Sequence, residues 1–342
     1  MMFRLQIYLF FFISLGFVAC SSKKDIDVSN ISLNLKIERF DQDMAHLSTK
    51  NLTKEAPSLQ KKYGFFYNDY MQRILEVGST ADTSYYSLLR IILNNKDYSE
   101  LQAAVASTFP NLNQPEKEIN EAFKHVLYYY PQQKIPRVIS FLSGFAVQTP
   151  IGNDYIGIGL DMFLGVGSKF YPALRSSLPQ YLTRRFTPEN IAPRVVEAFI
   201  RENMFPDGEA DNKSLMSRMI YNGKVMYAMN AMMPSLNDTL VIGYKTEHLN
   251  WCKNNEASIW AYFLDNNLLY ETDYLKIQKY LTEAPFTPGV GEQSESAPKL
   301  GVWIGWQIVK KYMDKNSDVT LQQLMANKDP QQILKQSKYK PK

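Results

Sequence analysis

The chain has 342 residues, of which 38 are Lys or Arg and 34 are Asp or Glu, giving a formal charge of +4 at pH 7. A charge this close to zero for the length argues against a nucleic-acid-binding surface, which needs a dense basic patch. Hydrophobic residues make up 45% of the sequence, which is enough for a sizeable core. We therefore expect a globular protein without a nucleic-acid partner.

Residues 1–19 have the pattern of a secretory signal peptide. The apolar run Leu5–Val18 follows a basic residue and is shorter than the roughly 20 residues that span a bilayer. Ala19 then precedes Cys20, which resembles the bacterial lipobox, where signal peptidase II cleaves before an acylated cysteine; Phe17 stands where leucine is usual. We expect lipid attachment at Cys20 and anchoring in membrane lipid. The alternative is an ordinary secretory signal with an incidental cysteine.

The mature chain begins with a polar stretch and one strand. Residues 20–30 lack periodicity and are predicted to form a lipidated flexible tether. Apolar residues then alternate over residues 31–37, a pattern typical of a half-buried strand. Over residues 54–130 the apolar spacing changes to three and four residues, which predicts helices until Pro131 ends them.

The second half combines a short sheet with further helices. Residues 135–150 and 154–165, rich in β-branched residues and glycine, predict two strands joined by a turn. The polar stretch 287–298 predicts a mobile loop, and residues 337–342 a disordered tail. We expect one mostly helical α+β domain over residues 31–336. Its further helices are predicted at residues 193–203, 213–233, 246–267, 299–313 and 320–326.

Two of these helices have features of a packed core. Residues 213–233 carry methionines at helical spacing, which is typical of side chains that fill a core. Residues 299–313 are apolar on nearly every side, which predicts burial. The G-x-x-x-G pair Gly301 and Gly305 in this stretch predicts close contact with another helix.

The helix at residues 193–203 carries a candidate catalytic carboxylate. Arg194, Glu197 and Arg201 are three and four residues apart, so they share one helix face and can form ion pairs. The other face carries the apolar residues Val195, Val196, Phe199 and Ile200. The composition alone predicts a solvated charged face opposite a buried one, and a catalytic role for Glu197 is the alternative.

The familiar signatures of metal, nucleotide and hydrolase sites are incomplete in this sequence. His46, His125 and His248 lie far apart, and none has a second ligand at a metal-type spacing. The glycine-rich stretches match no phosphate-loop motif, so we expect neither a metal nor a cofactor. Ser143 in FLSGF lacks the first glycine of the G-x-S-x-G nucleophile motif. Cys252 is predicted to be a buried, inert thiol.

The order of several segments resembles a known family. These segments are IERFD, YPQQKIPRVISFLSGF, YIGIGLDMFLG, KFYP, LPQYL, IYNGKVMYAMNAMMP and GVWIGWQIVKKY. Together with the lipoprotein signal, they resemble the gliding motility lipoprotein GldB family of the Bacteroidetes over most of the mature chain. The resemblance implies a lipid-anchored envelope protein on the inner or outer membrane, facing the periplasm or the cell surface. It also implies that the protein is required for surface gliding and that it has protein partners in the gliding machinery.

The same segments are similar to a more distant family of predicted zinc-dependent peptidases. Its members carry an HExxH helix after the GLDxFLG strand and a further acidic ligand in an E-G segment. In this chain Glu197 stands at the general-base position, while Val196 and Ile200 stand at the two histidines. Asn222 stands at the acidic ligand, and Lys299 replaces an arginine that often precedes the G-x-x-x-G helix.

This second resemblance implies a degenerate zincin-like fold that has lost its metal and its chemistry, because zinc catalysis needs three protein ligands. The leading hypothesis is a non-enzymatic structural or docking component, with Asp161, Glu197 and Asn222 as residues of the degenerate cleft. The alternative is an envelope hydrolase or peptidase with unrecognised catalytic residues, for which Glu202 is a further candidate. A third hypothesis is an assembly factor that acts through its surface alone.

Overall fold

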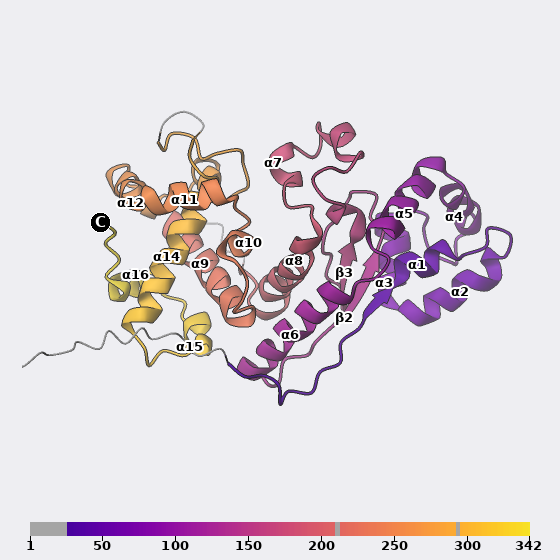
Figure 1. Ribbon diagram of the computed structural model, residues 1–342, viewed down its shortest axis with the longest axis horizontal. Coiled ribbons are helices and arrows are strands. Elements are labelled where there is room, and N and C mark those ends of the chain that lie inside the picture. The colour runs from indigo at the N-terminus through magenta and orange to yellow at the C-terminus, as the bar shows by residue number, and fades with distance from the viewer. Residues whose placement is uncertain (1–25, 209–212, 292–294) are drawn as a thin grey trace, which may run out of the picture.

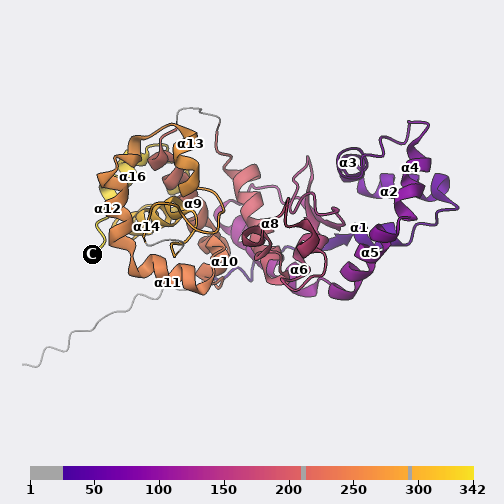
Figure 2. The ribbon, with the colours of Figure 1, turned by 90° about the horizontal axis from the view of Figure 1, so that it is seen from above.

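The computed structural model describes residues 26–208, 213–291 and 295–342 and has an elongated shape (Figure 1). The helices of residues 40–108 lie at one end, the sheet and the helix of residues 113–129 lie in the middle, and the C-terminal helices lie at the other end (Figures 1 and 2). One hydrophobic cluster joins the N-terminal helices to one face of the sheet, and a larger cluster contains most of the remaining core. The fold is mostly helical with a small sheet, which confirms the predicted α+β class.

The sheet has three parallel strands in the order β1-β2-β3. These are β1 (Ile37–Arg39), β2 (Arg137–Phe141) and β3 (Tyr155–Gly159). A parallel pair needs a crossover, and the N-terminal helices supply the one between β1 and β2. They are α1 (Phe40–Ala45), α2 (Leu52–Tyr63), α3 (Phe65–Asp69), the π-helix η1 (Tyr70–Ile74), α4 (Tyr85–Leu93), α5 (Lys96–Thr108) and α6 (Asn113–Tyr129).

The strand predictions need two corrections. The first strand is shorter than its alternating pattern indicated, because pairing begins only at Ile37 and Phe40 already starts α1. The predicted turn between β2 and β3 is wrong, because the two strands are parallel and residues 142–154 connect them. The last part of this connection runs antiparallel beside β3, where the Gly157 amide donates to the Pro150 carbonyl at 2.8 Å.

The middle of the molecule continues from β3 into the helix of the candidate carboxylate. The elements are η2 (Leu160–Phe163), η3 (Tyr171–Leu174), α7 (Gln180–Thr183), η4 (Pro188–Asn190), α8 (Ile191–Ala198) and the π-helix η5 (Phe199–Met204). α8 packs against α6 and β3, so the sheet and the N-terminal helices fix its position. The chain passes directly from α8 into η5, which keeps the helix going through a wider turn.

The C-terminal helices pack around the crossing of two long ones, α9 (Leu215–Met232) and α14 (Leu300–Lys315). A methyl group on Gly223 would collide with the backbone of Gly305, so the two helices approach each other closely. This confirms the predicted contact of the G-x-x-x-G segment. The methionines of α9 and most of α14 are buried, as predicted. The other elements are α10 (Asp238–Ile242), α11 (Thr246–Asn254), α12 (Glu256–Asp265), η6 (Leu268–Tyr270), α13 (Tyr274–Ile277), η7 (Gln278–Tyr280), α15 (Leu321–Ala326) and α16 (Pro330–Ser337).

The chain is more ordered near both ends than its composition indicated. Val28, in the expected tether, is 2% exposed and accepts a hydrogen bond from the Ile31 amide. After α15 the chain forms α16, which the sequence prediction missed, with Asp329 capping its first turn. Tyr339, in the expected tail, packs on Trp260 and donates to Glu256 at 2.7 Å. Ordered structure therefore extends beyond both limits of the predicted domain.

Two further predictions concern the region between α11 and α14. The single helix expected over residues 246–267 is divided at Asn255 into α11 and α12. The loop expected over residues 287–298 is fastened at its two ends. The Thr287 amide donates to the Ser296 hydroxyl at 3.0 Å, and that hydroxyl donates to the Thr287 carbonyl at 2.9 Å. Both side chains are buried, so these bonds stabilise the approach to α14.

Candidate functional site

The apolar face of α8 lies in the core as the sequence predicts. Val195, Val196, Phe199 and Ile200 are all 0% exposed and belong to the larger hydrophobic cluster. Val196 and Ile200 are the positions that would hold the two histidines of a zinc peptidase helix. Their side chains offer no electron pair to a metal, and their burial packs them against other apolar groups.

The charged face of α8 differs from the prediction. Glu197 is only 8% exposed, and three arginines surround its carboxylate. Arg194 donates to it at 2.6 Å and Arg201 at 3.0 Å, while Arg185 lies 3.7 Å away. The expected solvated face is therefore wrong. Two of the arginines are helix neighbours, but Arg185 comes from the segment after α7 and covers the carboxylate from outside the helix.

A second carboxylate, Glu283, which is half-buried, extends this arrangement. Its oxygens lie 2.6 Å from Arg184, 3.2 Å from Arg185 and 2.5 Å from Lys299. Arg185 contacts both carboxylates, so all these groups form one connected set. We call this set the charge network. It comprises Arg184, Arg185, Arg194, Glu197, Arg201, Glu283 and Lys299.

The charge network holds its two carboxylates in the ionised form. Burial alone would raise the pKa of Glu197, but Arg194, Arg201 and Arg185 outweigh it, and the pKa lies well below its usual range. Burial likewise opposes ionisation of Glu283, yet its basic neighbours lower its pKa to about 2. A general base works best with a pKa near the operating pH. The lowered pKa of Glu197 moves this carboxylate away from that range.

The pKa of Lys299 shows how unfavourable a positive charge is in this environment. Burial lowers its pKa to about 8, although the contact with Glu283 works in the opposite direction. Five cations share two carboxylates in the charge network, so the network carries three more positive than negative charges. The burial of unbalanced charge is unfavourable, so such an excess is expected where a site has a purpose beyond stability.

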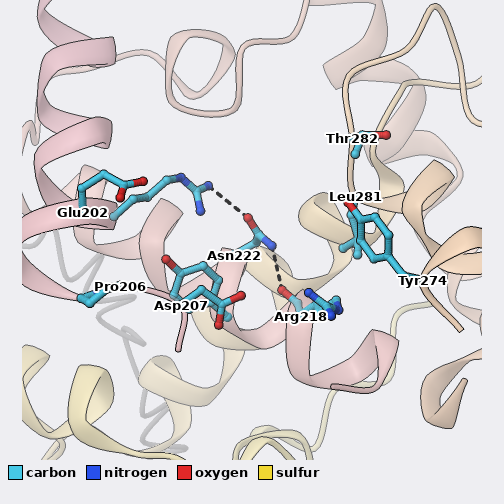
Figure 3. Close-up of a pocket in the computed structure, with 10 residues that line it drawn as sticks. Glu202, Pro206, Asp207, Arg218, Asn222, Tyr274, Leu281 and Thr282 are labelled. Atoms are coloured by element: carbon cyan, nitrogen blue, oxygen red, sulfur yellow. Dashed lines mark hydrogen bonds between the residues drawn. The ribbon is translucent and has the colours of Figure 1, made fainter. Parts of the chain in front are cut away.

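Asn222, the second candidate of the degenerate cleft, lies beside the charge network. Its side-chain oxygen accepts from Arg201 at 3.0 Å, and its amide nitrogen donates to the Arg218 carbonyl at 2.8 Å (Figure 3). A pocket of about 370 Å³, which we call pocket A, opens here. It is lined by Arg201, Glu202, Pro206, Asp207, Arg218, Tyr221, Asn222, Tyr274, Leu281 and Thr282. Glu202 is exposed, and Arg201 connects pocket A to Glu197.

Asp161, the third candidate, has a local structural role. It follows β3 in η2, is 0% exposed, and accepts hydrogen bonds from the Ser143 amide, the Ser143 hydroxyl and the Phe145 amide at 2.6–2.8 Å. Burial raises the pKa of Asp161, while these donors favour its ionised form. Phe145 has a positive φ of 64°, a strained conformation that these bonds stabilise. The hydrogen bonds of Asp161 join β2 to β3 and do not reach Glu197 or Asn222.

The residues at the positions that would hold zinc in a zinc peptidase do not fit the metal. Two of the three ligand positions are aliphatic and the third is Asn222, whose amide already bonds to Arg201 and to the backbone. Across residues 26–208, 213–291 and 295–342, no three His, Cys, Asp or Glu side chains gather as a metal site would require. Ser143, whose surroundings only partly match the G-x-S-x-G motif, is 3% exposed and donates a hydrogen bond to Asp161.

Sequence reasoning missed three members of the charge network, Arg184, Arg185 and Glu283. The only signal for the first two was the paired arginines in LTRRF. Glu283 had none, because it contacts arginines 98 and 99 positions earlier in the chain. Cys252 is buried with a raised pKa caused by burial, in agreement with the predicted inert thiol. Cys20 and the signal peptide lie outside the described residues.

Comparison with known proteins gives one match. The family model described as gliding motility protein GldB matches residues 21–341. Searches of the curated proteins and of the solved structures found no match. In the described part of the chain, no helix is both long and apolar enough to cross a membrane. The matched family is a lipoprotein family, which indicates a membrane-associated location in the cell envelope. The chain therefore belongs to the family of the gliding motility protein GldB, which gives it a role in gliding motility.

Proposed function

We propose that this protein is a non-catalytic component of the gliding machinery, held at the membrane by acylated Cys20 and docking a protein partner at pocket A. The proposal rests on the ion pairs of Glu197. Three arginines hold its carboxylate ionised, and the histidine positions beside it are aliphatic. A zinc peptidase needs a metal-activated water and a base that accepts its proton. The residues at this helix supply neither.

The chemistry of pocket A supports a protein partner. Its lining carries two cations, Arg201 and Arg218, and two acids, Glu202 and Asp207, so it does not select one sign of charge. Tyr274 lines the pocket and is 45% exposed, and Leu275 beside it is 77% exposed. Tyrosine and arginine are enriched at the centres of protein interfaces, where an apolar contact and a polar group act together.

Filling pocket A tests the docking part of the proposal. Thr282 is an exposed residue of the lining, so Thr282→Arg places a long side chain in the pocket without disturbing the core. We expect cells carrying this variant in place of their own copy to stop gliding at normal protein abundance. Thr272→Arg, at an exposed threonine outside the pocket, is the matched control and leaves gliding intact. Normal gliding of both variants would exclude pocket A as the docking site.

Metal content tests the non-catalytic part. The chain with Cys20→Ala, purified without chelators, should carry no stoichiometric zinc when measured by mass spectrometry of the released metal. One tightly bound zinc per chain would contradict the proposal and favour an envelope hydrolase. In that case the metal would need ligands other than the aliphatic residues Val196 on α8 and Ile200 on η5.

A further inference from the structure

A second pocket, which we call pocket B, lies at the other end of the charge network. It has a volume of about 470 Å³ and lies where the end of α7 meets the start of α11. Arg184, Lys245 and His248 line it, together with Thr183 and Tyr181. None of its lining residues is acidic, whereas pocket A has two acids. Pocket B therefore contains one member of the charge network, Arg184, and its lining presents basic side chains without an acid.

Two nitrogen atoms at pocket B have unused hydrogen-bonding capacity. The Arg184 guanidinium donates to Glu283 and to the Gly243 carbonyl through one terminal nitrogen, but its buried Nε has no partner. The Nδ1 atom of His248 is also buried without a hydrogen bond. Both nitrogens are shielded from solvent by protein, so the cationic side chains of the lining, and not these two atoms, define what pocket B can bind.

The surroundings of pocket B add positive potential. Behind Arg184, the charge network has three cations more than carboxylates. α11 begins at Thr246, and Lys245, at the N-cap position, makes no side-chain capping bond, so unpaired backbone amides and the helix dipole lie near the pocket. Glu247 is an acid in that turn, but it is not part of the lining. A bound group with two negative charges would offset most of this excess.

We propose that pocket B binds the phosphate of a phosphomonoester. The Arg184 fork and the ammonium of Lys245 suit phosphate oxygens, and a dianion balances the local charge better than a single carboxylate does. The pocket is larger than a phosphate ion, so an attached organic group fits beside Tyr181 and the exposed Val166. Such an ester could be a soluble sugar phosphate or the headgroup of a lipid. This assignment goes beyond the docking function, because the two pockets share no lining residue.

Titration calorimetry of the Cys20→Ala chain with inorganic phosphate, at constant ionic strength, tests the site. We expect one binding site with a dissociation constant in the millimolar range or tighter. Arg184→Gln should weaken binding by about tenfold or more, because it removes a charge-assisted contact. Arg184→Gln also removes an ion pair of the charge network and can destabilise the fold. Lys245→Gln avoids this second effect. Lys245 is exposed, and its loss should weaken binding several-fold without affecting the fold.

Lys253→Gln is the matched control, since Lys253 is exposed on the same helix but lies outside pocket B. Absence of phosphate binding would overturn the proposal, and so would binding that Lys245→Gln and Lys253→Gln reduce equally. Acetate that binds as tightly as phosphate would overturn the choice of a dianion. Two further binding measurements identify the source of the phosphomonoester. Binding of glucose 1-phosphate supports a soluble ester, and retention on phosphatidylcholine vesicles only when they contain phosphatidic acid supports a lipid headgroup.

Discussion

Glu197→Gln should be strongly destabilising, because Glu197 is the centre of one half of the charge network. The amide keeps the shape of the side chain but removes the negative charge shared by Arg185, Arg194 and Arg201. Removing one partner of a buried ion pair costs about 3–5 kcal/mol, because the remaining charge stays buried without compensation. The Glu197 side chain is 11% exposed, so solvent screens this loss only weakly.

Urea denaturation of the Cys20→Ala chain, followed by circular dichroism, measures the effect. With a slope of about 3 kcal/mol per molar urea, the expected loss moves the midpoint down by about 1 M or more. Glu202→Gln is the matched control, because Glu202 is an exposed acid five positions further along the same continuous helix. Its effect should stay within about 0.5 kcal/mol. Equal midpoints for the two variants would refute the view that Glu197 is a buried structural ion.

A second substitution tests the cause of the instability. Adding Arg194→Gln to Glu197→Gln removes a cation that the first change leaves without an acidic partner. The double variant should therefore be more stable than the sum of the two single changes predicts. If the change in the free energy of unfolding of the double variant equals the sum of the two single changes, Arg194 and Glu197 are not energetically coupled.

Three other predictions concern packing, pH and the anchor. Gly223→Ala should cost about 1–3 kcal/mol or more, because the new methyl group meets the Gly305 backbone, whereas Gly167→Ala has open space and serves as the control in the same thermal melt. Glu283, with a pKa of about 2, contributes about 3 kcal/mol of stability above pH 4.5 that is lost as the pH falls toward 2. Urea midpoints should therefore fall less steeply with acid in Glu283→Gln than in the parent, and parallel curves would contradict this. Cys20→Ala should abolish incorporation of labelled fatty acid in cells while Cys252→Ala retains it, and continued labelling of Cys20→Ala would disprove the lipidation site.

Features set by local spacing could be predicted from the sequence. The apolar face of α8, the buried methionines of α9 and the close contact of α14 all follow from helical periodicity, which acts within a few residues. The missed helix α16 also had a local signal, since Asp329 and Pro330 form a typical helix start. Local sequence patterns therefore predicted the individual helices better than the way in which they pack together.

Features set by distant contacts could not be predicted. The sequence predicted a solvated charged face on α8. It could not show that Arg185 and Glu283 join the charge network from other segments. The direction of β3 relative to β2 depends on the path of residues 142–154, and strand periodicity is the same in parallel and antiparallel pairs. Asp161 was a candidate for the cleft, but its bonds to Ser143 make it a brace between two strands. In each case the deciding partner lies far away in the sequence.

The most direct test of the account is gliding by cells whose only copy carries Arg194→Gln together with Glu197→Gln. The pair removes the candidate base and one of its cations, so the net charge of the charge network is unchanged. Cell speed on a surface is measured at matched protein abundance, with normal folding confirmed by circular dichroism of the purified variant. We predict gliding at the speed of the parent cells. Loss of gliding by cells that contain normal amounts of the folded variant would contradict a non-catalytic role for Glu197.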